Sequence, residues 1–169
     1  FKIIREDTLV NPGFIENDEL KKFNVILANP PYSIKRWDQK AFENDPYGRN
    51  IWGTPPKKCA DYAFEQHIHK SMNNNNGRCI QLWPHGVLQR ISEKEIRVKM
   101  IKSGTVEAVI GLGPNLFYGS AMESCIMILN QNKNEKEKVL FIDALNQTSR
   151  LNNKNYLSNK NLQTIFEVF

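Results

Sequence analysis

The sequence lacks the features of membrane, exported and disulfide-rich proteins. Among its 169 residues no apolar run approaches the roughly 20 that a membrane helix needs, and no signal-peptide-like apolar segment is present. Its three cysteines, Cys59, Cys79 and Cys125, have no CxxC spacing, which argues against a disulfide framework or a zinc knuckle. These absences predict a soluble protein in a reducing compartment, the cytoplasm, with no membrane contact.

Several common catalytic and cofactor motifs are also missing. No Gly-x-Ser-x-Gly sequence is present, so a serine hydrolase finds no support. Gly111 and Gly113 follow an apolar run, but the third glycine of a dinucleotide-binding loop is absent and a tight turn is preferred. His67 and His69 are two residues apart and would point to different faces of a helix, so no metal site is predicted.

What the sequence does contain is the composition of one globular domain. Hydrophobic residues make up 40% and charged residues 24%, which excludes a fully disordered chain. Lys and Arg total 23 and Asp and Glu total 18, so the formal net charge is 23 − 18 = +5. This basic balance permits a polyanionic partner without requiring one.

Short apolar runs alternate with helix-like stretches. The runs that predict strands are residues 1–4, 23–28, 78–83, 106–112, 124–129 and 139–144. The stretches that predict helices are residues 59–72, 93–101 and 157–169, with Ser92 as a possible N-cap of the second and Ser158 or Asn159 of the third. Alternation of this kind predicts an α/β fold.

Residues 33–58 are predicted to form one long loop, and loops of that length are usually functional.

The most informative segment is Asn29-Pro30-Pro31-Tyr32, directly after the predicted strand 23–28. Two prolines fix φ and remove two backbone donors, so the turn is stiff. In open α/β sheets, ligands bind in the crevice at the carboxyl ends of strands. The Asn29 amide oxygen and the Pro30 carbonyl can accept hydrogen bonds from a planar amino group there, and Tyr32 can stack on its ring. A rigid turn without function is the competing interpretation.

An adenine base suits that arrangement. Its exocyclic amine is a poor nucleophile because the lone pair is delocalised into the ring. Hydrogen bonds to Asn29 and Pro30 would favour the tetrahedral, nucleophilic nitrogen, and stacking on Tyr32 would contribute about 1–3 kcal/mol. The base must first leave the duplex. The methyl of S-adenosylmethionine would be the electrophile, and neither a metal nor a covalent nucleophile is needed.

Longer segments resemble a known family, the modification subunits of type I restriction-modification systems, which are N6-adenine DNA methyltransferases. The resemblance covers the chain from about Asp7 to its end. Its segments are TPPKKCADYAFEQH (54–67), GRCIQLWPHGVL (77–88), VEAVIGLGPNLFYGSAMESCIMILN (106–130), VLFIDA (139–144) and the closing NYLSNKNLQTIF. Several ordered motifs at matching intervals are more specific than the tetrapeptide alone.

The resemblance implies a class I S-adenosylmethionine-dependent methyltransferase fold, a Rossmann-like sheet with flanking helices and an antiparallel last strand. It implies that Asp7 contacts the adenine of the cofactor and that Asn29 adjoins the cofactor as well as the target amine. Phe117 would be a second aromatic wall for the flipped base, with Tyr118 as a competitor. The implied partners are double-stranded DNA, a specificity subunit that reads the target and a restriction subunit.

The chain departs from the family pattern in one respect. The glycine-rich cofactor loop, the acidic residue on the ribose and the amino-terminal helical domain do not occur in this sequence. Residues 1–169 are therefore expected to be the carboxyl-side portion of a methyltransferase catalytic domain, one that does not methylate alone.

Basic residues surround the tetrapeptide and the long loop. Lys35, Arg36, Lys57 and Lys58 are predicted to contact the DNA backbone, and Lys40 and Arg49 belong to the same group. Trp37, Tyr47 and Trp52 lie among them as possible stacking or packing residues. A charged, solvated loop is the alternative.

Two other functions stay open at this level. The same tetrapeptide serves methyltransferases that act on protein glutamine amides or on guanine amines in RNA, because planar amino groups present the same donors to two acceptors and a ring. A non-catalytic module that docks to a specificity subunit is the third possibility.

Overall fold

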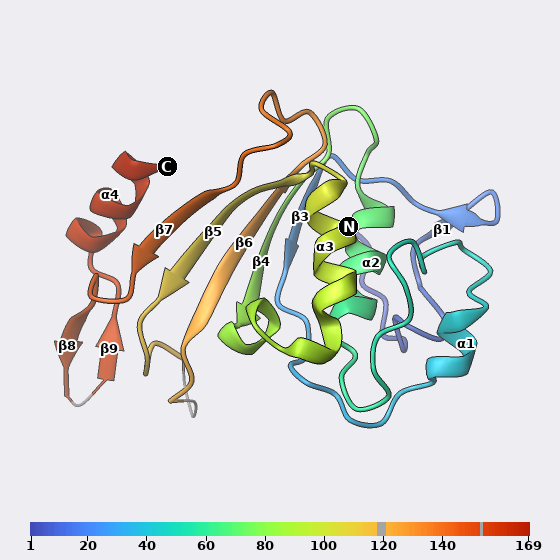
Figure 1. The fold of residues 1–169 in the computed structure, drawn as a ribbon, viewed down its shortest axis with the longest axis horizontal. Helices are drawn as coiled ribbons and strands as arrows, with labels where there is room; N and C mark the ends of the chain where they lie inside the picture. Colours follow the sequence, from blue (N-terminus) through green and yellow to red (C-terminus); the bar gives the residue numbers. More distant parts are fainter. Residues whose placement is uncertain (118–120, 153) are drawn as a thin grey trace.

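A computed structural model describes residues 1–117, 121–152 and 154–169. Its centre is a five-stranded sheet with the order β3-β4-β6-β5-β7 (Figure 1). The strands are β3 (Val25–Ala28), β4 (Arg78–Pro84), β5 (Val106–Leu112), β6 (Ser124–Asn130) and β7 (Leu140–Ala144). β3 runs parallel to β4 and β5 parallel to β7, whereas β6 lies antiparallel between β4 and β5. The α/β fold with one reversed strand is confirmed.

Both faces of the central strands are apolar, as their nearly continuous hydrophobic sequences require. In β5, Ala108, Val109 and Ile110 are consecutive and all buried. The pairing of β6 with β4 is complete over seven residues, from Pro84 opposite Ser124 to Arg78 opposite Asn130. The sheet is therefore continuous and buried at its middle, and irregular only at its margins.

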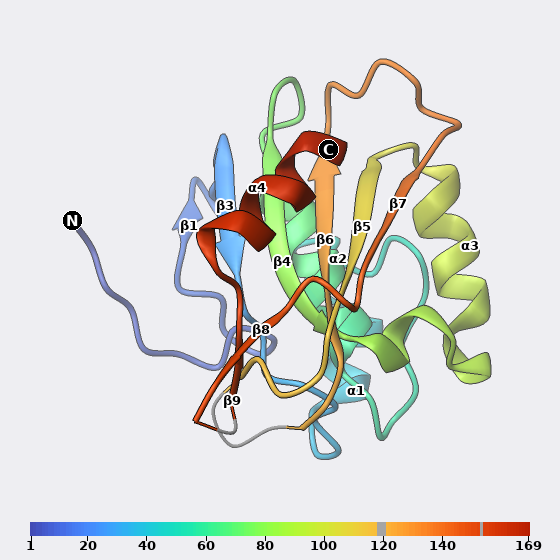
Figure 2. The ribbon, with the colours of Figure 1, turned by 90° about the vertical axis from the view of Figure 1, so that its left-hand side faces the viewer.

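Helices cover the two faces of the sheet unequally. α2 (Asp61–Ser71) and α3 (Lys94–Lys102) lie on one face, and α4 (Asn159–Val168) lies on the other (Figure 2). The first face has a core of fourteen buried residues that includes Tyr62 and Trp83. α4 begins with a capping box in which Ser158 and Asn161 exchange hydrogen bonds. Ser158, one of the two predicted caps, is thus the N-cap.

Smaller elements surround the sheet. They are the hairpin β1 (Ile15–Glu16) and β2 (Glu19–Leu20), the hairpin β8 (Ser149–Leu151) and β9 (Lys154–Tyr156), the short helix α1 (Gln39–Glu43), and two 3₁₀ helices, η1 (His85–Leu88) and η2 (Ile91–Glu93). α1 lies inside the segment predicted as one long loop, with Asp38 as its N-cap. Within the described ranges, no helix is long and apolar enough to cross a membrane.

Two local predictions are wrong. Residues 1–4 form no strand, and Phe1 and Ile3 are exposed, because a strand needs a neighbour for its ladder and none lies beside this segment. Ser92 does not cap α3, because η2 occupies residues 91–93 and Glu93 becomes the N-cap without a side-chain hydrogen bond.

Candidate functional site

The Asn29–Tyr32 turn follows β3 at its carboxyl end, as the sequence predicts. Asn29 is exposed, Pro30 is buried and Tyr32 is half-buried. In the described part of the chain, the Asn29 amide forms no hydrogen bond, so its oxygen is available to a ligand. Pro30 packs inward and fixes the turn to the body of the protein.

The Tyr32 side chain reaches the start of β6. Its hydroxyl lies near the Ser124 hydroxyl and the Cys125 thiol. Burial is the main reason that the pKa of Tyr32 is raised, so the phenol stays protonated. Because Ser124 pairs with Pro84, Tyr32 lies near the carboxyl end of β4. The ring is therefore located at the sheet edge where the prediction places ligands.

Asp7 lies in an exposed turn that it stabilises itself. Its Oδ1 accepts hydrogen bonds from the backbone N–H groups of Leu9 at 3.0 Å and Val10 at 3.2 Å. Its carbonyl oxygen accepts from Asn11 N at 2.7 Å. One carboxylate oxygen orients the side chain, which leaves Oδ2 for a donor outside the chain.

Arg49 is buried and joins the long loop to the Asp7 turn. Its guanidinium donates to the carbonyl oxygens of Thr8 and Leu9, both at 2.7 Å. It also pairs with Asp45, with Nε at 2.8 Å and Nη2 at 2.5 Å from Oδ1. Arg49 is only 1% exposed, so grouping it with the DNA-facing cations was wrong. Its planar guanidinium, with five N–H donors, suits several acceptors at once, whereas a lysine would reach fewer.

The residue after Tyr32 is held by a second buried cluster. Ser33 N donates to Asp61 Oδ1 at 2.8 Å, and Arg90 Nη1 donates to Ser33 Oγ at 3.2 Å. Arg90 also pairs with Asp61 and Glu93, each at 2.5 Å. The sequence analysis missed this cluster, although an acidic residue, Asp61, near the start of a predicted helix was a visible signal.

Cys59, Asp61 and Glu93 also approach the spacing of metal ligands, with one ligand atom from each within 4.8 Å of the others. Arg90 already donates to both carboxylates, however, and the Cys59 thiol donates to Asp61 Oδ2 at 2.9 Å. Burial raises the pKa of Cys59 to about 12, which opposes the thiolate that a metal would need. The cluster is an ion-pair network.

The other cysteines are also core residues. Cys79 and Cys125 are buried and free, and burial raises the pKa of each thiol, that of Cys125 to about 12. A high pKa removes the reactive thiolate. This agrees with the prediction that they are small core side chains.

The predicted DNA-contacting cations lie on the surface. Lys35, Arg36, Lys57 and Lys58 are all exposed.

The aromatic residues near the turn differ in exposure. Trp52 is buried, and its backbone N–H donates to Gln66 Oε1 at 2.7 Å, so it packs the loop onto α2. Trp37 is half-buried and packs edge-on against Phe42. Phe117 is 36% exposed and so accessible, whereas Tyr118 lies outside the described residues.

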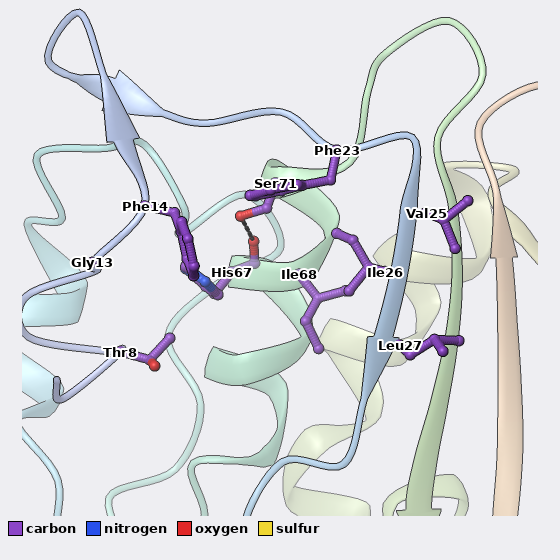
Figure 3. Close-up of a pocket in the computed structure, with 10 residues that line it drawn as sticks. All are labelled: Thr8, Gly13, Phe14, Phe23, Val25, Ile26, Leu27, His67, Ile68 and Ser71. Atoms are coloured by element: carbon purple, nitrogen blue, oxygen red, sulfur yellow. Dashed lines mark hydrogen bonds between the residues drawn. The ribbon is translucent and has the colours of Figure 1, made fainter. Parts of the chain in front are cut away.

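A separate apolar cavity of about 310 Å³ borders the free edge of β3 (Figure 3). In the close-up, Ile26 points toward Ile68 of α2, while Val25 and Leu27 point to the other side of the strand (Figure 3). Asn29 and Tyr32 do not line it. The cavity is therefore a space for apolar packing beside the strand, distinct from the turn.

Solved structures share this fold. A type I restriction-modification methyltransferase subunit from Streptococcus thermophilus matches with a TM-score of 0.85 and 30% identity, over 95% of this chain and 34% of that one. The type I restriction enzyme EcoKI M protein matches with a TM-score of 0.66 and 17% identity, over 94% of this chain and 32% of that one, a likeness of fold. The sheet is that of the class I S-adenosylmethionine-dependent methyltransferases.

Sequence comparison shows to which family of these methyltransferases the chain is similar. The N-6 DNA Methylase family model matches residues 1–169. The HindI methylase subunit of Haemophilus influenzae is 36% identical over 82% of this chain, and the MpnII methylase subunit of Mycoplasma pneumoniae is 30% identical over all of it. The chain belongs to the N-6 DNA methylase family. It spans about a third of the length of these relatives, 30% and 32% respectively.

Proposed function

We propose that this chain is the carboxyl-side portion of the catalytic domain of a type I DNA methyltransferase subunit. The complete subunit transfers a methyl group from S-adenosylmethionine to N6 of an adenine that has left the DNA duplex. The observation that carries the proposal is the exposed, unpaired Asn29 amide on a proline-stiffened turn at the carboxyl end of β3. Family membership supports DNA adenine as the substrate.

The turn acts on the target amine by orientation. The Asn29 amide oxygen and the Pro30 carbonyl accept hydrogen bonds from the two N6 hydrogens, and Pro31 keeps the turn rigid. Tyr32 stacks on the base, with its hydroxyl near Ser124 at the start of β6. Phe117 supplies a second aromatic contact from the segment after β5.

Asp7 fits the cofactor role on its own geometry. Its Oδ1 is occupied by two backbone donors, so Oδ2 has a fixed direction and can accept from the amine of the cofactor's adenine. Arg49 holds the carbonyl oxygens of Thr8 and Leu9, which follow Asp7. S-adenosylmethionine, when bound, supplies the electrophilic methyl group.

The remaining cofactor contacts come from a part of the protein outside this chain. β3 has a free edge, and Val25 and Leu27 beside it are 68% and 75% exposed. Further strands of the complete sheet pair with this edge and fill the adjacent cavity. This chain alone therefore lacks methyltransferase activity.

Double-stranded DNA and a specificity subunit are the partners, with a restriction subunit as a third component, all in the cytoplasm. Lys35, Arg36, Lys57 and Lys58 contact the DNA backbone. Replacing Lys57 and Lys58 together with Ala in the complete complex should weaken DNA binding and reduce its salt dependence by a slope of about 1–2. Fluorescence anisotropy at several salt concentrations measures both, and an unchanged slope excludes these contacts.

Asn29→Ala in the complete subunit tests the catalytic proposal. Loss of one oriented hydrogen-bond partner should lower methyl transfer to DNA by about 100-fold or more. Asn24→Ala, the same change at the opposite end of β3, is the matched control and should keep wild-type turnover. Transfer of labelled methyl groups to DNA, RNA and protein measures the rate and the substrate class together. Near-normal DNA methylation by Asn29→Ala, or a preference for RNA or protein, would overturn the proposal.

A further inference from the structure

Ser33 has an unfavourable backbone conformation that one hydrogen bond holds in place. Its φ is +50°, in the left-handed region that a residue with a side chain rarely adopts. Its N–H donates to Asp61 Oδ1 at 2.8 Å, and Asp61 is completely buried at the first position of α2. The chain direction immediately after Tyr32 therefore depends on a residue 28 positions away.

Arg90 holds the same residue through its side chain. It donates to Ser33 Oγ at 3.2 Å and to Asp61 Oδ2 at 2.5 Å, while its Nε is 2.5 Å from Glu93 Oε2. Asp61 and Glu93 are both 0% exposed, so neither touches a bound ligand. The network takes its members from three segments: the turn, the start of α2 and the segment that follows β4.

We propose that Asp61 and Arg90 are positioning residues for the amine-binding turn. The turn is attached at β3 before Asn29, and at Asp61 and Arg90 through Ser33. The first attachment sets where the turn begins, and the second sets the direction in which the chain leaves it. Without the second, Ser33 relaxes to negative φ and the Tyr32 ring rotates away from the plane of the base.

This inference rests on the proposed function, because it assigns a purpose to the geometry of that same turn. A purely structural network would also stabilise α2. The two roles separate at the two oxygens of Asp61: Oδ2 pairs with Arg90 and Cys59, whereas Oδ1, among the described residues, accepts a hydrogen bond only from Ser33 of the turn. Glu65 is the natural comparison, since it is a buried carboxyl group one helical turn further along α2 that contacts Gln81.

The test compares Asp61→Asn with Glu65→Gln in the complete methyltransferase complex. Asp61→Asn removes the charge that Arg90 needs and lets the amide rotate away from Ser33. We expect single-turnover methylation at saturating DNA and S-adenosylmethionine to fall about 10- to 100-fold. The dissociation constant for S-adenosylmethionine, from calorimetry, should change less than about threefold. Glu65→Gln should keep the wild-type rate.

Hydrogen exchange gives a second readout that does not depend on activity. In Asp61→Asn, exchange at the amides of residues 32–35 should accelerate at least about tenfold while that of the β4 amides stays unchanged. If wild-type complex methylates no adenine, the proposed function fails and this readout still decides whether Asp61 holds the turn. Wild-type exchange and a wild-type rate in Asp61→Asn would overturn the inference.

Arg90→Lys covers the case in which Asp61→Asn does not fold. Arg90 is partly exposed, and a lysine can pair with only one of the two carboxylates and loses the reach to Ser33. The rate should fall about 3- to 10-fold with the affinity for S-adenosylmethionine retained. Equal losses in rate and in cofactor affinity would instead assign the network to stability alone.

Discussion

The two faces of the sheet differ in how completely this chain covers them. On the face of α2 and α3, large side chains such as Trp83 and Met127 are 1–2% exposed, and the Tyr62 and Trp83 rings stack with centroids 6.5 Å apart. On the face of α4, Ile80 and Phe166 are 46% and 70% exposed. A cavity of about 600 Å³ is lined by residues of α4 and of the strands, among them Ile128 and Leu162.

The difference shows which part of the protein this chain packs by itself. The α2–α3 face has a complete core, in which the buried Gln66 side chain is hydrogen-bonded to Trp52 and Gly53. The α4 face has exposed apolar side chains near the free edge of β3, a surface that typically contacts another protein segment. The candidate site lies where the edge strand of this incompletely covered sheet ends, and it is attached to the complete face through Asp61.

The largest expected effect concerns the core, where truncating one aromatic side chain on each face of the sheet tests whether the two faces are packed differently. Trp83→Ala should reduce the free energy of unfolding by about 3–5 kcal/mol, because it removes a buried ring between α2 and the sheet. Phe166→Ala, an aromatic truncation on α4, should cost less than about 1 kcal/mol because the side chain is mostly exposed. Urea unfolding of the intact protein, followed by circular dichroism, measures both. Equal losses would show that the two faces are packed alike.

A smaller effect concerns the buried carboxyl group of Glu65. Burial raises its pKa to about 8 in the folded protein, above the ordinary value of 4.5. Below a pH of about 4.5 the Glu65 carboxyl is protonated in both the folded and the unfolded protein, and its contribution to the free energy of unfolding is fully present. This contribution is lost as the pH rises toward 8, because the unfolded protein releases the proton at a lower pH than the folded protein. The free energy of unfolding of Glu65→Gln should therefore rise by at least about 1 kcal/mol relative to that of the wild type as the pH increases from 4.5 to 8.

Unfolding curves of wild type and Glu65→Gln at several pH values measure this difference. Glu95→Gln is the control for the same substitution at the surface, because Glu95 is exposed on α3. If the difference in free energy of unfolding between Glu65→Gln and the wild type stays constant with pH, the Glu65 carboxyl is ionised in the folded protein.

The smallest expected effect concerns the N-cap that attaches α4 to its face of the sheet. Ser158→Ala removes the capping box and should cost about 1 kcal/mol, loosening α4 from its face of the sheet. Ser92→Ala should cost less than about 0.5 kcal/mol, because Ser92 is exposed and caps no helix. Amide exchange in residues 159–168 reports the loosening directly. Similar effects of the two changes would contradict the observed caps.

Five of the six predicted strands and all three predicted helices are present in the structure, because those elements have strong apolar periodicity. The sequence-based prediction failed at residues 1–4, where an apolar run has no neighbouring strand, and it missed α1 and the two hairpins, which are too short for a periodic signal. It placed the Asn29–Tyr32 turn correctly after a strand. It assigned Arg49 to the surface because charge alone does not reveal a partner such as Asp45.

The sequence by itself determined the strands, the helices and the position of the turn, because these follow from side-chain periodicity and from the restricted backbone of proline. Only the tertiary structure decided what holds the turn. Ser33, Asp61 and Arg90 are far apart along the chain, and a buried charge persists only where folding brings a partner within hydrogen-bonding distance. Such pairings depend on the distances between elements, which no local pattern of residues encodes.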